Sequence, residues 1–242
     1  MNLILIPGFW LDGSSWHDVT PALVAAGHTL HPVTLPGLES VDADRSGITL
    51  RDHIDAVTVL VDTLRESSAD EPIVLIAHSG GGAVAHGVVN ERPDAIARVV
   101  YVDSGPLGDG GCVNDELPVV DGEIPLPDFG FFDDEDLVDM TDEVRARFRE
   151  ISIPMPVGPA YDKQVLTNPR RFDVPVTVIA CEFPSSMLIE MMEGGHPYVA
   201  ELARISDREF IDLPTGHWPQ FTQPTQLGDA IAGAVSRDIH PS

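Results

Sequence analysis

The hydrophobic positions of the chain form short continuous runs that alternate with longer stretches of helical spacing. Runs rich in β-branched residues predict strands at residues 2–6, 28–35, 73–77, 97–102, 174–180 and 209–213. Between these runs, apolar residues recur at helical spacing, which predicts helices at residues 15–26, 48–66, 82–90, 185–205 and 226–235. Such alternation is typical of an α/β fold, with a mostly parallel, doubly wound sheet covered by helices on both faces.

The alternation stops between residues 104 and 172. This stretch is rich in Pro, Gly and Asp and predicts only one helix, near residues 134–150. We interpret residues 104–172 as a cap inserted into a single domain that spans residues 1–242. A chain of 242 residues, 43% of them hydrophobic, is long enough to bury one full core.

Composition excludes some partners of the chain. A formal net charge of -25 argues against nucleic acid and anionic membranes, because phosphate binding needs a basic face. No apolar run approaches the ~20 residues of a membrane span. The first residues lack a basic leader, and two cysteines fit a reducing compartment, so we expect a cytoplasmic protein, monomeric or homodimeric, that acts on a small molecule.

The clearest chemical motif is the sequence IVLIAHSGGG at residues 73–82. A hydrophobic strand delivers Ser79 into a glycine-flanked turn that opens a helix, as in a nucleophile elbow. The positions two before and two after the serine must be small so that strand and helix can pack closely, and Ala77 and Gly81 satisfy this. A phosphate-binding loop is disfavoured because G-x-x-x-x-G-K-[ST] is absent.

A nucleophilic serine needs a base and donors for the oxyanion. Among nine histidines, His217 is the candidate base, since it follows the last predicted strand in the sequence LPTGHWP. The backbone N–H groups of Gly80 and Phe9 are the expected oxyanion donors. We expect Trp10, His78 and Trp218 to contact the substrate. Apolar side chains of the cap and its flank suggest an apolar pocket lining, with core packing as the alternative for each: Phe129, Phe131, Phe132, Met140, Met155, Met187 and Met191.

With these motifs in order, the chain resembles the α/β-hydrolase superfamily, especially small cofactor-free esterases and methylesterases. The resemblance implies the α/β-hydrolase fold, with the cap after the strand that follows the nucleophile helix. It covers nearly the whole chain, from the turn at Pro7 and Gly8 through the Ser79 elbow and the cap to His217. It implies no cofactor, and the acidic residues of the cap have no convincing metal-ligand spacing.

The third catalytic residue departs from the usual pattern of the superfamily. Most relatives place an aspartate at the end of the turn that here reads CEFP, where Pro184 occupies its position. Some relatives take the acid from the end of the strand after the nucleophile helix, and Asp103 stands there. Asp103 is the favoured acid, Glu182 is the alternative, and a Ser–His dyad stays open.

The expected reaction is hydrolysis of a small, largely apolar carboxylic ester or lactone through an acyl-enzyme on Ser79. A hydrolase-fold ligand sensor with little turnover is the competing hypothesis. A hydroxynitrile-type lyase is disfavoured because Lys163 lies in a polar stretch near the end of the cap. A haloalkane dehalogenase is excluded because it needs an aspartate in place of Ser79.

Overall fold

The computed structural model describes residues 1–236. A six-stranded sheet with the order β2-β1-β3-β4-β7-β8 forms the centre of the protein. Neighbouring strands pair in parallel throughout this sheet. The predicted fold class is therefore confirmed. The strands are β1 (Asn2–Ile6), β2 (Thr29–Pro32), β3 (Ile73–His78), β4 (Ile96–Val102), β7 (Val176–Ala180) and β8 (Arg208–Asp212).

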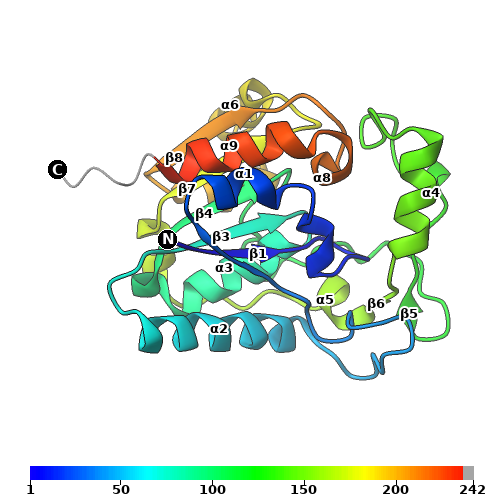
Figure 1. Ribbon diagram of the computed structural model, residues 1–242, viewed down its shortest axis with the longest axis horizontal. Coiled ribbons are helices and arrows are strands. Elements are labelled where there is room, and N and C mark those ends of the chain that lie inside the picture. Colours follow the sequence, from blue (N-terminus) through cyan, green and yellow to red (C-terminus); the bar gives the residue numbers. More distant parts are fainter. Residues whose placement is uncertain (237–242) are drawn as a thin grey trace.

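Helices cover both faces of the sheet (Figure 1). On one face lie α2 (Leu50–Ser67) and α3 (Gly81–Glu91), and on the other α1 (Thr20–Ala25) and α9 (Pro224–Ser236). Alternate residues of β1 separate accordingly, since Ile4 and Ile6 join one core cluster while Leu3 and Leu5 join the other. The remaining helices of the sheet domain are α6 (Ser185–Glu193), α7 (Ala200–Arg204) and α8 (Pro219–Thr222).

Residues 104–172, the predicted cap, leave the sheet and form small elements. They contain α4 (Asp142–Ile151), α5 (Val157–Tyr161) and an antiparallel pair of β5 (Glu123–Ile124) with β6 (Met155–Pro156). In Figure 1, α4 lies beyond the carboxyl ends of the strands. Short 3-10 helices occupy Gly13–Trp16, Pro93–Ala95, Phe129–Phe131, Pro169–Asp173 and Pro197–Val199.

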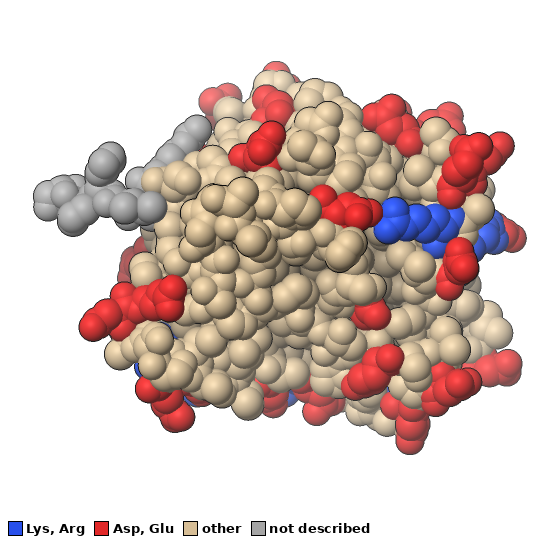
Figure 2. Space-filling model, in the orientation of Figure 1, with Lys and Arg blue, Asp and Glu red and all other residues tan. Residues whose placement is uncertain are grey.

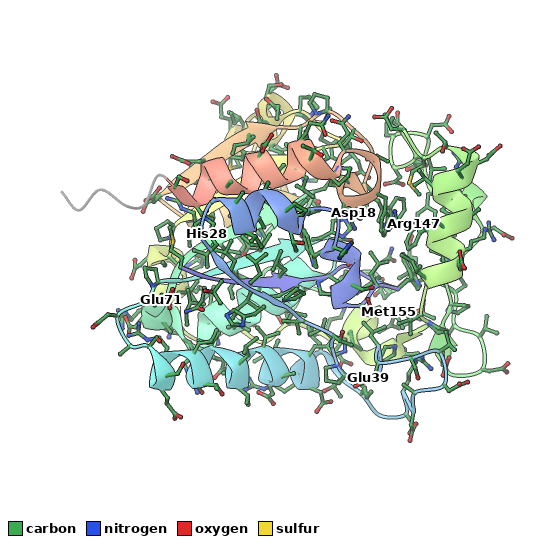
Figure 3. The ribbon with its side chains drawn as sticks, viewed as in Figure 1. Asp18, His28, Glu39, Glu71, Arg147 and Met155 are labelled. Atoms are coloured by element: carbon green, nitrogen blue, oxygen red, sulfur yellow. The ribbon has the colours of Figure 1, made fainter. Side chains whose placement is uncertain are left out.

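Aromatic packing and several ion pairs join residues 104–172 to the core, among them Arg45 with Glu123 at 3.1 Å. The rings of Phe132 and Phe148 lie 5.1 and 5.2 Å from that of Trp218, in edge-to-face arrangements. Arg147 of α4 reaches Asp18 at 3.0 Å, and Figure 3 shows the two side chains facing each other across the gap between α4 and the core. Both partners are partly exposed, so the aromatic contacts contribute more to holding α4 than the ion pair does.

Three predicted helices and one predicted strand are shorter than expected. The helix at 15–26 gives way to a 3-10 turn followed by α1, which has Pro21 in its first turn. The helix at 185–205 stops at Gly194, and α7 begins only after Pro197. In the cap, turns occupy most of residues 134–140 before α4 begins, and the second strand ends at Pro32.

The surface of the protein is strongly acidic. On the face shown in Figure 2, acidic side chains are scattered over the whole outline, whereas basic side chains gather mainly near α4. Among residues 1–236, no helix has the length and hydrophobicity that crossing a bilayer requires.

Candidate active site

The turn between β3 and α3 places Ser79 at the carboxyl edge of the sheet. Ser79 has a positive φ of 51°, and a Cβ added to Gly81 would lie 2.6 Å from the carbonyl oxygen of Pro7. Only glycine therefore fits at that position. Trp10 and Asp103, at the ends of neighbouring strands, also have positive φ angles of 64° and 42°. Such strained residues cluster at functional sites.

His217 lies between Ser79 and Asp103, as expected from the sequence. The Ser79 hydroxyl donates to Nε2 of His217 at 2.8 Å, and the Nδ1–H of His217 donates to Oδ2 of Asp103 at 2.7 Å. The carboxylate fixes this tautomer, because only a protonated Nδ1 can donate to it. Nε2 is then left as an acceptor that faces the serine.

Asp103 is held rigidly by the backbone of the turn after β7. Its Oδ1 accepts the N–H groups of Cys181 and Glu182 at 3.0 and 3.1 Å, which leaves Oδ2 for His217. The turn with Pro184 in the usual aspartate position therefore contributes backbone donors, while the acid comes from β4. Burial alone would raise the pKa of Asp103, but these hydrogen bonds and the one from His217 lower it.

A second carboxylate approaches the same imidazole. Oε1 of Glu182 lies 3.3 Å from Nδ1 of His217, in an ion-pair contact without a well-directed hydrogen bond. Burial raises the pKa of Glu182 to about 7, with Asp136 and Asp103 adding to the rise. Burial would lower the pKa of His217, but Asp103 and then Glu182 outweigh it and hold that pKa above its usual range.

The turn after β1 lies directly against the serine. A Cβ added to Gly8 would lie 2.9 Å from Cβ of Ser79, so Gly8 lets the next residue, Phe9, approach the nucleophile. Within residues 1–236, the backbone N–H groups of Phe9 and Gly80 have no hydrogen-bond acceptor outside regular helices and strands. Both N–H groups are thus available beside Ser79, where an oxyanion would form.

A cavity of about 610 Å³ opens at Ser79, and its lining differs from the one expected. Trp10 and Trp218 are buried in the aromatic packing between cap and core and do not line it. The seven Phe and Met residues that the sequence offered for either the pocket lining or the core are also absent from its walls. Five of them pack in or against the core, while Phe131 and Met187 are exposed.

His78 also lies away from the cavity and instead supports the loop that carries His217. Burial lowers the pKa of His78 to about 3, so the ring is neutral and its Nε2–H donates to the carbonyl of His217 at 2.6 Å. Gln220 contacts Nδ1 of the same ring at 3.3 Å. The sequence placed His78 beside the nucleophile but gave no sign of this supporting contact.

Comparison with known proteins assigns the family. The model of the alpha/beta hydrolase family matches residues 3–230. The chain belongs to this family. A pyrethroid hydrolase from Sphingobium wenxiniae is 26% identical, over 96% of this chain and 86% of that protein.

Solved structures show the same fold for this hydrolase. An extracellular alpha/beta-hydrolase from a Paenibacillus species aligns with a TM-score of 0.72 and 22% identity, over 97% of this chain and 98% of the other. A methylesterase from Arabidopsis aligns with a TM-score of 0.73 and 19% identity, over 98% of this chain and 99% of the other.

One group of residues in the hydrolase has the proximity of a metal site. Ligand atoms of Asp103, Glu182 and His217 lie within 4.8 Å of one another. However, both oxygens of Asp103 already accept hydrogen bonds, and Nδ1 of His217 donates one of them. A cation bound there would have to displace these bonds, so the atoms fit an acid–base pair better than a ligand set.

Gly216 is where the His217 loop passes closest to the cap. A Cβ at this position would lie 2.7 Å from the carbonyl oxygen of Val138, and the next N–H, of His217, donates to the carbonyl of Asp136 at 2.9 Å. Gly216→Ala should therefore displace His217 or the cap, lowering kcat about 10- to 100-fold and stability by about 1–3 kcal/mol. Steady-state kinetics and thermal unfolding measure both effects.

Gly233→Ala is the matched control, because a Cβ there meets nothing within 4 Å. Gly233 lies within α9, so alanine should leave kcat unchanged and raise stability slightly. Equal kcat in the Gly216→Ala variant and the wild type would show that this backbone contact does not position His217.

Proposed function

We propose that this member of the alpha/beta hydrolase family is a serine hydrolase that cleaves carboxylic esters or lactones, with Ser79 as nucleophile, His217 as base and Asp103 as the acid that orients it. The hydrogen-bonded series from Ser79 through His217 to Asp103 is the observation that carries the proposal. The similarity to a pyrethroid hydrolase and a methylesterase supports ester hydrolysis. The proposal retains three expectations from the sequence: no cofactor, a cytoplasmic location, and a monomer or homodimer.

In the first half-reaction, Nε2 of His217 takes the proton of the Ser79 hydroxyl as Oγ attacks the carbonyl carbon of the ester. The N–H groups of Phe9 and Gly80 stabilise the negative oxygen of the tetrahedral intermediate. His217 then gives its proton to the leaving alkoxide, which departs as the alcohol. In the second half-reaction, His217 deprotonates water, water attacks the acyl group, and the acid leaves as Ser79 regains its proton.

The test of the proposed function is turnover of p-nitrophenyl esters of increasing acyl length. A serine hydrolase releases p-nitrophenol steadily, and a covalent serine-directed phosphonate stops the release and adds its mass to the peptide that contains Ser79. A ligand sensor would give no more than one slow release per chain. That outcome, or labelling elsewhere with full loss of activity, would refute the proposal.

The pH dependence of kcat/KM should reflect the two carboxylates at His217. The base acts only when neutral, so the rate rises as His217 loses its proton. Asp103 and Glu182 raise the pKa of His217. The midpoint of the pH profile should therefore lie above about 6.5, the pKa of an ordinary imidazole. Glu182, whose pKa burial raises to about 7, is in contact with the same imidazole, so the midpoint belongs to the coupled pair.

The variant Glu182→Gln tests this cause directly. Removing one of the two carboxylates should lower the pKa of His217 and move the midpoint to lower pH. Glu66→Gln, on the exposed end of α2 outside the cavity, is the control and should leave the profile in place. A Glu182→Gln profile that stays in place or moves to higher pH would contradict the assigned cause.

A further inference from the structure

The cavity that opens at Ser79 continues well past the catalytic residues. It reaches Arg171, in the 3-10 helix Pro169–Asp173, and both Glu201 and Arg204 of α7. Glu201 contacts His86, seven residues beyond Ser79 and within α3, so this part of the cavity is its far end, about 10 Å along the helix from the serine. The walls also include apolar side chains, those of Leu107, Val113, Leu188, Val199 and Leu202. A ligand that fills the cavity from Ser79 to α7 would therefore be apolar in its middle and polar at its far end.

A buried ion pair forms part of the far end. Nε of Arg171 donates to Oε1 of Glu201 at 2.7 Å, and Nη1 donates to the carbonyl of Asn168 at 2.9 Å. Arg171 is 6% exposed and Glu201 is 8% exposed. Among the described residues, no group accepts a hydrogen bond from Nη2 of Arg171. A buried ion pair is a weak source of stability, so its place in a cavity wall suggests another purpose.

Arg204 adds a second guanidinium at the same end. The Cζ atoms of Arg171 and Arg204 lie 4.1 and 3.8 Å from the ring centroid of Phe172, so one aromatic ring orients both side chains. Arg204 is exposed and, within residues 1–236, has no ion pair and no hydrogen bond. It is a cation without a carboxylate partner in a chain that carries 39 acidic and 14 basic residues.

Two guanidiniums and two carboxylates lie at this end, so the preference for an anion comes from the donors that have no acceptor. Glu201 balances one of the two guanidiniums, and its Oε1 also accepts from His86 at 3.0 Å. Asp109 lines the cavity too and is exposed, as Arg204 is, but its Oδ1 accepts the backbone N–H of Leu166. The uncommitted polar groups of the two arginines are N–H donors, and guanidinium groups match the geometry of a carboxylate.

We propose that Arg171 and Arg204 bind a carboxylate of the substrate, so that the preferred substrates are half-esters: apolar molecules with an ester at one end and a free carboxylate at the other. This inference rests on the proposed function, since it takes Ser79 as the site of ester cleavage. Arg171 and Arg204 are then specificity-determining residues at the opposite end of the cavity from the chemistry.

The test compares monomethyl esters of the six-, eight- and ten-carbon linear dicarboxylic acids with their dimethyl esters, by methanol release. At the best chain length, the half-ester should have a kcat/KM at least about tenfold higher than the neutral diester. Arg204→Gln should reduce that preference about tenfold, mainly through KM, and Arg204→Lys should restore part of it. Arg65→Gln, at the exposed end of α2, is the control and should keep the preference.

Two outcomes overturn the carboxylate site while leaving the serine hydrolase in place. One is a higher kcat/KM for the diester than for the half-ester at every chain length. The other is an equal loss of kcat/KM for half-esters and diesters in Arg204→Gln. If no ester is hydrolysed, the proposed function fails, and calorimetric titration of the half-esters then decides the binding site separately. Binding to the wild type that weakens about tenfold in Arg204→Gln supports the site, and equal or absent binding refutes it.

Discussion

Replacement of Ser79 by alanine should abolish ester hydrolysis and leave the fold intact. Loss of the nucleophile from a serine hydrolase lowers kcat by about 10⁴-fold or more. The substitution removes one hydroxyl and its hydrogen bond to His217, so stability should change by no more than about 1 kcal/mol. The positive φ at this position is unchanged by alanine, because the surrounding turn imposes it.

The experiment measures kcat of the purified variant together with its thermal unfolding. Ser14→Ala is a suitable control, since the Ser14 side chain bonds only the neighbouring Asp12 on the exposed turn before α1. It should keep full activity. Near-normal turnover by Ser79→Ala, in a preparation in which active-site titration excludes a contaminating esterase, would remove Ser79 from the mechanism.

Local sequence patterns predicted the sheet and the positions of the central residues. Continuous apolar runs are sufficient to identify buried parallel strands, and the strand–glycine–helix order around residue 79 identifies the elbow. Because carboxyl ends of parallel strands share one edge of the sheet, Asp103 and His217 were expected near Ser79. The structure brings all three together.

Which residues line the cavity depends on contacts between distant parts of the chain, which local sequence patterns do not predict. Trp10 and Trp218 are the kind of residues that line pockets, but the cap covers them, and nothing in their neighbouring residues predicts this. Arg171 and Arg204 are 33 positions apart in the sequence, and both guanidinium groups lie against the ring of Phe172. Helix boundaries near Pro21 and Pro197 were misplaced because apolar spacing continues across these prolines.

Asp103→Asn should lower kcat about 10⁴-fold, the size of the effect in serine proteases, through a change in the tautomer of His217. Oδ1 of residue 103 faces the N–H groups of Cys181 and Glu182, so the asparagine oxygen must stay there. Its amide NH₂ would then face Nδ1 of His217 and favour an imidazole that carries its proton on Nε2. Such an imidazole cannot accept the proton of Ser79.

Glu182→Gln is the matched comparison, and it should reduce kcat at the optimum pH by less than about tenfold. Glu182 lies farther from Nδ1 than Asp103 does, at 3.3 against 2.7 Å, and lacks a directed hydrogen bond. When Asp103 is replaced, the Glu182 carboxylate can still accept a hydrogen bond from Nδ1–H and so partly favour the active tautomer of His217. The double variant should therefore be slower than Asp103→Asn alone. A larger loss in Glu182→Gln than in Asp103→Asn would make Glu182 the orienting acid, while the contact between Ser79 and His217 would keep its proposed role.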